Sequence, residues 1–174
     1  MMAMSSDHDL HRLSISVGRH LLERGLFLTT AESCTGGWVA KAVTDIAGSS
    51  QWFTEGWVTY SNEAKRSHLG VAAGVLKRHG AVSEAVVSAM ARGALRRAGA
   101  QVAVAVSGIA GPGGAVPGKP VGTVWFAWVL RAGARTQVRT MCKQFRGGRD
   151  VVRSSAVRYA LRGVIQCSTA ASTV

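Results

Sequence analysis

Residues 101–106 constrain the fold more than any other stretch of this sequence. The segment consists almost entirely of valine and alanine, and such a continuous apolar run is typical of a strand that is covered on both faces. It leads directly into a glycine-rich loop at residues 107–114. A strand of this kind predicts a layered domain in which helices pack against a sheet.

Helical and strand-like segments are mixed along the rest of the chain. Apolar residues at three- and four-residue steps predict helices at about residues 7–24, 38–46, 62–69, 72–78, 83–98 and 148–164. Runs rich in β-branched and aromatic residues predict further strands at residues 26–30, 52–60, 121–130 and 136–145. Gly56 is a candidate bulge.

The last two predicted strands form a hairpin, so the sheet is expected to be mixed rather than all parallel. No internal repeat or linker divides the chain. We therefore predict a single α/β domain at residues 8–165, with a disordered N-terminal tail at residues 1–7 and a C-terminal tail at residues 166–174.

The chain has 174 residues and a formal net charge of +12, which is a reason to consider a nucleic-acid partner. Its arginines are spread along the sequence, however, and no RNA-binding aromatic signature, zinc-finger spacing or basic arm is present. An anionic small-molecule substrate or an arginine-rich proteome explains the charge equally well. We therefore do not expect a nucleic-acid partner.

Cysteine usage and the N-terminus indicate the compartment. The three cysteines are odd in number and too far apart for a metal knuckle, which fits a reducing environment. The N-terminus lacks the apolar core of a signal peptide, and no apolar run approaches a membrane span. The five histidines show no metal spacing. We expect a cytoplasmic protein with no membrane association and no metal site.

The junction at residues 29–37 is the first candidate functional site. A predicted strand stops there at small and polar residues, and a helical pattern follows. The hydroxyls of Ser33 and Thr35 therefore lie beside the unpaired N–H groups of a first helical turn, which can hold an oxyanion or a phosphate. The alternative is that Ser33 or Thr35 only caps the helix, while Gly36 and Gly37 only allow the turn.

Residues 58–66 contain a candidate base. Lys65 falls in the first turn of a predicted helix, where partial positive charge and desolvation lower the pKa of a lysine, and a neutral lysine can act as a base for a serine. The simpler alternative is a solvated lysine. Tyr60 is placed to relay a proton or to orient substrate, or it only ends the strand. Lys41 is a competing base that helical geometry places in solvent, and Cys34 is a rival nucleophile that we interpret as a small buried residue.

The loop at residues 107–114 is the third candidate functional site. Four glycines in eight residues follow the predicted buried strand, and they allow backbone N–H groups to approach an anion closely. The pattern matches neither a P-loop nor a dinucleotide fingerprint. A plain connecting loop, stiffened by Pro112 and Pro117, is the alternative.

Five blocks in this order resemble the C-terminal domain of the competence/damage-inducible protein CinA: residues 30–37 (TAESCTGG), 58–65 (VTYSNEAK), 79–84 (HGAVSE), 107–112 (SGIAGP) and 119–124 (KPVGTV). The resemblance covers about residues 8–165. It implies a three-layer α/β/α sandwich, no metal and no cofactor. Stand-alone members of this family are nicotinamide-nucleotide amidases, so the resemblance implies hydrolysis of nicotinamide mononucleotide to nicotinate mononucleotide and ammonia.

Two features set this chain apart from the family pattern. The family's separate N-terminal domain, related to molybdopterin-binding proteins, is not part of this sequence, and we expect the activity of that domain to be absent. Ser107 stands where the family pattern suggests threonine, and residues 113–115 stand where an acidic residue is common. The expected ligand loop is therefore the part that differs most.

The residues and the resemblance together predict amide hydrolysis through a serine. We expect Ser33 to attack the carboxamide carbon, Lys65 to act as base and Tyr60 to assist proton transfer to ammonia. N–H groups of residues 35–37 would stabilise the oxyanion, and the glycine-rich loop with Arg146 would hold the phosphate. The predicted substrate-binding residues are Thr35, Gly36, Gly37, Ser61, Ser107, Gly108, Gly111, Gly113 and Arg146.

Other hypotheses remain open from the sequence. In one alternative, water is the attacking group and Ser33 only positions the substrate. The chain is alternatively a catalytically silent nucleotide-binding or regulatory module, which would tolerate loss of Lys65. A nucleic-acid binder would instead show strongly salt-dependent affinity. Exposed tryptophans would favour a homo-oligomer.

Overall fold

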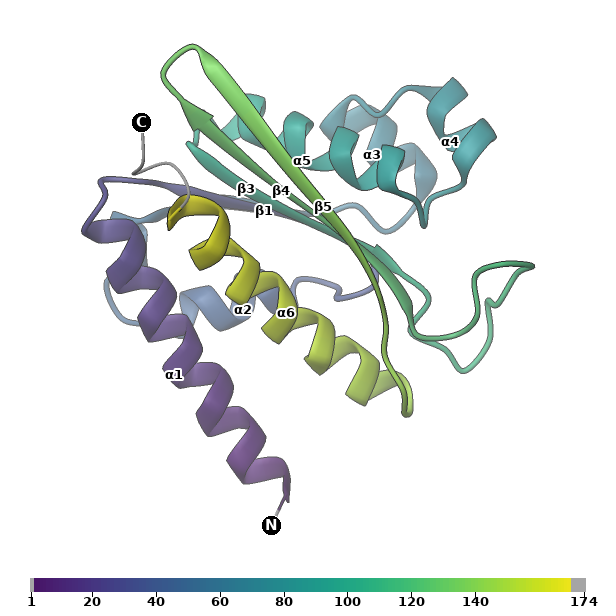
Figure 1. Cartoon of the computed structure of the whole chain (residues 1–174), viewed down its shortest axis with the longest axis horizontal. Coiled ribbons are helices and arrows are strands. Elements are labelled where there is room, and N and C mark those ends of the chain that lie inside the picture. Colours follow the sequence, from purple (N-terminus) through teal and green to yellow (C-terminus); the bar gives the residue numbers. More distant parts are fainter. Residues whose placement is uncertain (1, 170–174) are drawn as a thin grey trace.

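The computed structural model describes residues 2–169, and the side chains from residue 8 onward (Figure 1). The helices are α1 (Met2–Leu22), α2 (Trp38–Thr44), α3 (Asn62–Leu69), α4 (Ala73–His79), α5 (Glu84–Ala98) and α6 (Arg149–Thr169), with a short 3-10 helix at Ser49–Gln51. The strands are β1 (Leu28–Glu32), β2 (Phe53–Val58), β3 (Val102–Gly108), β4 (Thr123–Ala132) and β5 (Arg135–Gln144).

The strands form one sheet in the order β2-β1-β3-β4-β5. Strand β1 pairs in parallel with β2 and β3, whereas β3, β4 and β5 pair antiparallel, so the predicted mixed sheet and the late hairpin are confirmed. The predicted irregularity at Gly56 is also present, because the register between β1 and β2 shifts by one residue there. A Cβ atom on Gly56 would lie 2.5 Å from the hydroxyl oxygen of Thr30.

Helices cover both faces of the sheet, which confirms the three-layer α/β/α sandwich (Figure 1). Helices α1, α2 and α6 pack on a face with large side chains, including Phe126 and Trp128, and helices α3, α4 and α5 pack on a face with small ones, including Ala103 and Ala105. On the first face the indole N–H of Trp128 donates to the carbonyl of Ala160 in α6 at 2.9 Å. Strand β3 therefore packs against bulky side chains on one face of the sheet and against a close-packed helix on the other.

The path of the chain creates a crevice at the carboxyl end of β1. The connection from β1 to β2 runs through α2 on one face, and the connection from β2 back to β3 runs through α3, α4 and α5 on the other. The connections that leave the adjacent strands β1 and β2 thus run to opposite faces of the sheet. In open α/β sheets such a switch point leaves room for a ligand beyond the strand ends.

Both ends of the described chain are helical. Helix α1 begins at Met2, within the predicted tail at residues 1–7, and α6 continues to Thr169, past the predicted domain end at residue 165. The extension of α6 has a packing reason, because Cys167 and Ser168 are buried. Residue 1 and residues 170–174 lie outside the described residues. Within residues 2–169, no helix is long and apolar enough to cross a membrane.

Candidate active site

Ser33 lies at the crevice, directly after β1. Its amide donates to the carbonyl of Val106 at the end of β3 (2.9 Å), which continues the sheet by one residue and fixes the start of the turn. Gly36 and Gly37 then adopt positive φ angles of 61° and 91°, a region that favours glycine. The residues from 33 to 37, called here the catalytic turn, therefore reverse the chain into α2 within a few residues.

Lys65 reaches the same point from α3. Its Nζ lies 3.1 Å from Ser33 Oγ, 2.6 Å from the carbonyl oxygen of Thr59 and 3.4 Å from that of Tyr60. The residue is only 1% exposed, and burial lowers the pKa of the Lys65 amine. A neutral amine has two N–H groups and one lone pair. Two carbonyls and the Ser33 hydroxyl accept from Lys65 Nζ, and when the amine is neutral its lone pair can instead accept the Ser33 proton.

The two rivals of this pair are placed differently. Burial raises the pKa of the Cys34 thiol to about 12, which disfavours the reactive thiolate. Lys41 forms an ion pair with Asp45 at 2.6 Å, with 66% of its side chain exposed. The expectation that Lys41 lies in solvent is confirmed.

Ser33 and Lys65 open onto a cavity of about 260 Å³, called here the front pocket. The glycine-rich loop forms one wall, and four of the predicted substrate-binding residues lie there: Ser107, Gly108, Gly111 and Gly113. The Ser107 hydroxyl donates to the carbonyl of Ala81 at 2.9 Å, which joins this loop to the segment before α5. The structure thus brings together three sequence blocks that are far apart in the chain.

Tyr60 and Arg149 also line the front pocket. Arg149 Nη2 donates to the Tyr60 hydroxyl at 3.0 Å, and Nη1 donates to the carbonyl of Gly111 at 2.7 Å. Arg146, predicted to bind phosphate, is exposed and does not line the pocket. Arg149 starts helix α6 beside the pocket, whereas Arg146 precedes the helix, and the phosphate role of Arg146 stays a prediction.

Two amides of the catalytic turn do not have the predicted role of stabilising an oxyanion. Gly36 donates to the carbonyl of Ser33 (3.0 Å) and Gly37 donates to a carboxylate oxygen of Glu32 (3.1 Å). Their N–H groups are therefore engaged and are not free for an oxyanion. The amide of Thr35 donates to no acceptor among residues 2–169. Ser61 caps α3 by accepting from the amide of Ala64 at 3.0 Å, away from the pocket lining.

Glu32 is a buried residue that the sequence prediction missed. It is 1% exposed, and besides Gly37 its carboxylate accepts from the amides of Val39 (2.9 Å) and Ala40 (2.8 Å). A carboxylate stabilises the positive end of a helix and occupies its unpaired N–H groups. Glu32 therefore supplies the cap of α2, the role first considered for Ser33 and Thr35, and leaves the Ser33 hydroxyl available to Lys65.

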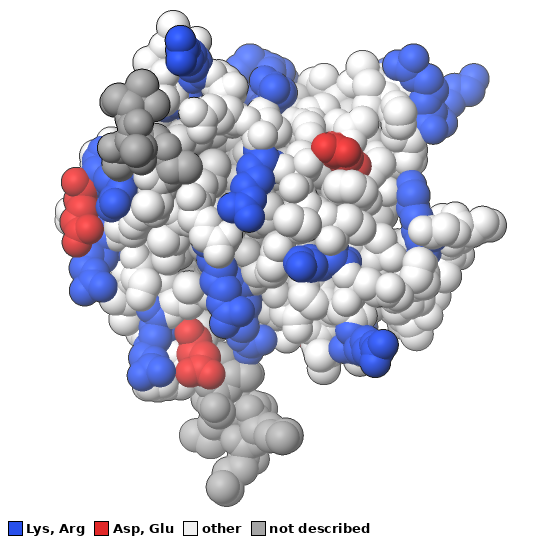
Figure 2. All heavy atoms as spheres, viewed as in Figure 1, with Lys and Arg blue, Asp and Glu red and all other residues white. Residues whose placement is uncertain are grey.

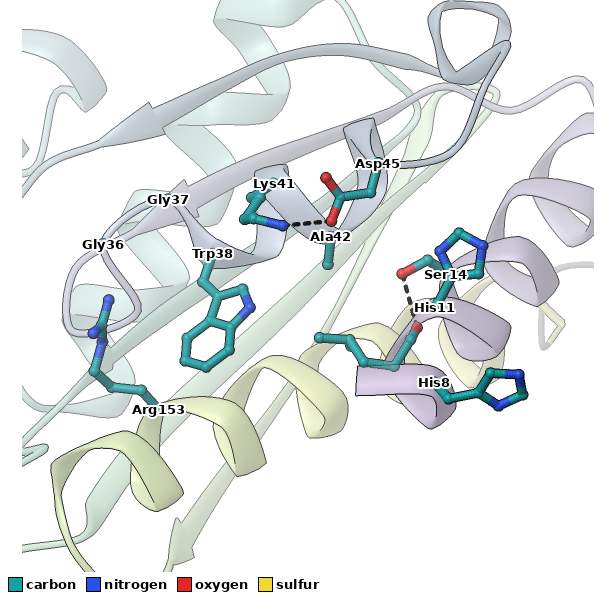
Figure 3. Close-up of a pocket in the computed structure, with 11 residues that line it drawn as sticks. His8, His11, Ser14, Gly36, Gly37, Trp38, Lys41, Ala42, Asp45 and Arg153 are labelled. Carbon is teal, nitrogen blue, oxygen red and sulfur yellow. Dashed lines mark hydrogen bonds and ion pairs between the residues drawn. The ribbon is translucent and has the colours of Figure 1, made fainter. Parts of the chain in front are cut away.

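A second cavity, called here the rear cavity, touches the catalytic turn at Gly36 and Gly37 (Figure 3). Its volume is about 780 Å³, and it lies between α1, α2 and α6. Arg153 of α6 lines it, stacked over the ring of Trp38 with 5.5 Å between guanidinium carbon and ring centroid. The same guanidinium donates to the carbonyls of Cys34 (3.2 Å) and Thr35 (3.1 Å).

Figure 2 shows lysines and arginines scattered over one face of the molecule and not gathered in a single patch. Among the described residues, no group of three histidine, cysteine or acidic side chains is arranged to hold a metal ion.

The model of the CinA C-terminal domain matches residues 10–168, almost the whole described chain. The chain belongs to the CinA C-terminal domain family. The resemblance predicted at about residues 8–165 is confirmed, with bounds that differ by two or three residues at each end.

Relatives within the CinA family share much of this sequence. The chain is 56% identical over 161 residues to the nicotinamide-nucleotide amidohydrolase PncC of Escherichia coli K12, covering 92% of this chain and 96% of that protein. It is 50% identical over 157 residues to the PncC protein of Pseudomonas putida, covering 90% and 96%.

A solved member of the CinA family has the same fold. The competence damage-inducible protein A of Klebsiella pneumoniae matches with a TM-score of 0.87 and 47% identity, over 92% of this chain and 97% of that one. The layers and the crevice at β1 are thus features of a fold that other family members share.

Proposed function

We propose that this protein is a nicotinamide-nucleotide amidase, which hydrolyses the carboxamide of nicotinamide mononucleotide to nicotinate mononucleotide and ammonia. The observation that carries the proposal is the 3.1 Å contact between the buried Lys65 amine and the Ser33 hydroxyl at the front pocket. The names of the PncC relatives support the substrate. A serine paired with a neutral amine suits acyl transfer from an amide.

The reaction begins with Ser33. Its Oγ attacks the carboxamide carbon while its proton passes to the neutral Nζ of Lys65, and a tetrahedral intermediate forms. Collapse of this intermediate breaks the C–N bond, and the nitrogen leaves as ammonia after receiving the proton held by Lys65, assisted by Tyr60. Water then attacks the acyl-enzyme, Lys65 accepts a proton from it, and the proton returns to Ser33 as nicotinate mononucleotide is released.

The phosphate of the substrate requires cationic or N–H donors at the far side of the pocket. Arg149 supports this role, because it reaches the rim and is already oriented by its bonds to Tyr60 and to Gly111. Backbone amides of the glycine-rich loop lie on the adjacent wall. A guanidinium with neighbouring N–H groups matches the geometry of a phosphate.

The assembly and compartment are part of the same proposal. Ile15 and Leu22 of α1 are large apolar side chains that are 46% and 47% exposed, which supports a homo-oligomer. The three cysteines are unpaired, which is compatible with a reducing cytoplasm. Light scattering after size-exclusion chromatography measures the assembly, and a monomeric mass at micromolar concentration would remove the oligomer from the proposal.

The test is the identity of the products and of the intermediate. Purified protein with nicotinamide mononucleotide should release ammonia and nicotinate mononucleotide in equal amounts. Rapid quenching followed by mass spectrometry should find the acyl group on the peptide that contains Ser33. Ammonia without any trapped ester, even when the acyl-enzyme is stabilised at low pH, would favour direct attack by water. Absence of ammonia from folded protein would refute the amidase.

A further inference from the structure

The end of strand β1 carries two polar side chains that serve opposite faces of the sheet. Side chains alternate between the two faces along a strand, and Leu28 and Ala31 of β1 pack in the two different apolar cores. In keeping with this alternation, the Glu32 carboxylate accepts from amides of α2 on one face. The Ser33 hydroxyl accepts from Lys65 of α3 on the other face. The orientations of Glu32 and Ser33 are therefore linked.

Glu32 also closes the catalytic turn on itself. Its carboxylate accepts from the amide of Gly37 at 3.1 Å, while the amide of Ser33 donates to the carbonyl of Val106 at 2.9 Å. The turn is thus tied at its start to the end of β3, and at its end to the residue that precedes it. The short ring that results restricts the positions that the Ser33 side chain can take.

The same carboxylate accounts for the start of α2. The first amides of a helix have no partner within the helix, and the glycine at the N-cap of α2 has no side chain to bond them. Glu32 accepts from the amides of Val39 (2.9 Å) and Ala40 (2.8 Å) instead. One buried side chain therefore holds the end of the strand, the turn and the start of the helix in a fixed arrangement.

We infer that Glu32 is a positioning residue for the Ser33–Lys65 pair: it holds the catalytic turn so that the Ser33 hydroxyl stays within hydrogen-bond distance of the lysine. That contact measures 3.1 Å, and a displacement of about 1 Å in a reacting group can lower a rate about 100-fold. Glu32 does not line the front pocket, so it acts through Ser33 and not on the substrate. The inference rests on the proposed function, in which Ser33 is the nucleophile and Lys65 its base.

The first test compares Glu32→Gln with Val43→Ala. Glutamine keeps the length of the side chain, but an NH₂ group replaces one carboxylate oxygen and cannot accept from the α2 amides. Val43→Ala removes buried methyl groups of the same helix and destabilises it through packing alone. We expect kcat to fall about 10- to 100-fold in Glu32→Gln, with KM changed less than about twofold. The kcat of Val43→Ala should stay within about twofold of the wild type.

A second readout does not need the substrate. Methanesulfonyl fluoride is a small reagent that forms a sulfonate ester with an activated serine, releasing fluoride while the serine proton passes to the base. Mass spectrometry measures the rate at which the peptide that contains Ser33 is labelled. This rate should fall in Glu32→Gln by about the same factor as kcat. It should not change in Val43→Ala, nor in Glu55→Gln, which alters an exposed glutamate on the neighbouring strand β2.

Glu32→Asp covers the case in which Glu32→Gln does not fold. Aspartate keeps a negative charge beside the start of α2, but its side chain is one methylene group shorter and cannot hold the turn in the same place. We expect a melting temperature close to that of the wild type, with kcat and labelling rate about tenfold lower. Wild-type values of both rates in Glu32→Asp would overturn the inference.

The outcomes separate this inference from the proposed function. Rapid labelling of Ser33 in a wild type that releases no ammonia would refute the amidase, and slower labelling in Glu32→Gln would still support the positioning role. Wild-type kcat and labelling rate in folded Glu32→Gln would refute the inference alone. Equal losses of both rates in Glu32→Gln and Val43→Ala would assign Glu32 a purely structural role and also overturn it.

Discussion

The front pocket and the rear cavity touch the same catalytic turn, yet they hold their lysines in opposite environments. Lys65 at the front is buried between two carbonyls and the Ser33 hydroxyl, whereas Lys41 at the rear lies in solvent beside Asp45. The rear cavity is about three times larger by volume (780 against 260 Å³). We therefore expect the buried Lys65, and not the solvated Lys41 at the larger cavity, to be the reactive lysine.

Removal of the front-pocket hydroxyl should have the largest effect. Ser33→Ala should lower kcat on the order of 10⁴-fold or more, because the acyl-enzyme can no longer form. Steady-state ammonia release measures the loss. Calorimetry should show that nicotinamide mononucleotide still binds, and residual activity within tenfold of the wild type would contradict a serine nucleophile.

Exchange of each lysine for methionine tests the comparison directly. Lys65→Met keeps the apolar stem and removes the amine, and kcat should fall about 10²- to 10⁴-fold, as is usual when a general base is lost. Lys41→Met removes a solvated amine of the same length, and its kcat should remain within about twofold of the wild type. Equal losses in both variants would place the base outside the Ser33–Lys65 pair.

The pH dependence should follow Lys65. The lysine acts as a base only when neutral, so kcat/KM should rise about tenfold per pH unit and level off above the pKa of Lys65. Because burial lowers that pKa from its usual 10.5, the plateau should begin below the pH at which an ordinary lysine loses its proton. Lys41→Met should leave the profile unchanged, and a profile that still climbs to pH 10.5 would show that the base is an ordinary lysine.

A smaller effect is expected at the rim of the front pocket. Arg149→Ala should raise KM for nicotinamide mononucleotide about 10- to 100-fold, in line with the loss of a charge-assisted hydrogen bond to phosphate. Arg146→Ala removes the same charge three positions earlier and should change KM less than twofold. With nicotinamide riboside, which has no phosphate, Arg149→Ala should lose this difference from the wild type. A KM effect of the same size in Arg146→Ala would return the phosphate to Arg146.

Much of the fold was accessible from sequence because its signals are local. The valine and alanine run at residues 101–106 predicted the covered strand, and turn residues 133 and 134 fall between the two strands of the predicted hairpin. The ends of the domain were harder to predict from the sequence. The predicted domain ends at residue 165, yet buried Cys167 and Ser168 lie on a further turn of α6.

The residues of the candidate site also differ in whether a local sequence signal predicts them. Ser33 and Lys65 each stand at a strand-to-helix junction that the sequence marks, and the family motifs include both. Arg149 and Arg153 act across 89 and 119 residues of chain, and no local pattern distinguishes them from other surface arginines. Glu32 had a weaker signal, an acidic residue just before a predicted helix, where a carboxylate can cap free amides.

The main-chain carbonyls around Lys65 limit what an amino-acid substitution can change. A codon change can replace a side chain, but it cannot remove the carbonyl oxygens of Thr59 and Tyr60, which accept from this amine. The hydrogen-bond acceptors around the proposed base are therefore fixed by the path of the backbone and not by the side chains at these positions. Descendants of this gene can exchange the side chains at positions 59 and 60 and still keep a lysine with the same two acceptors, as long as the strand and helix that place them persist.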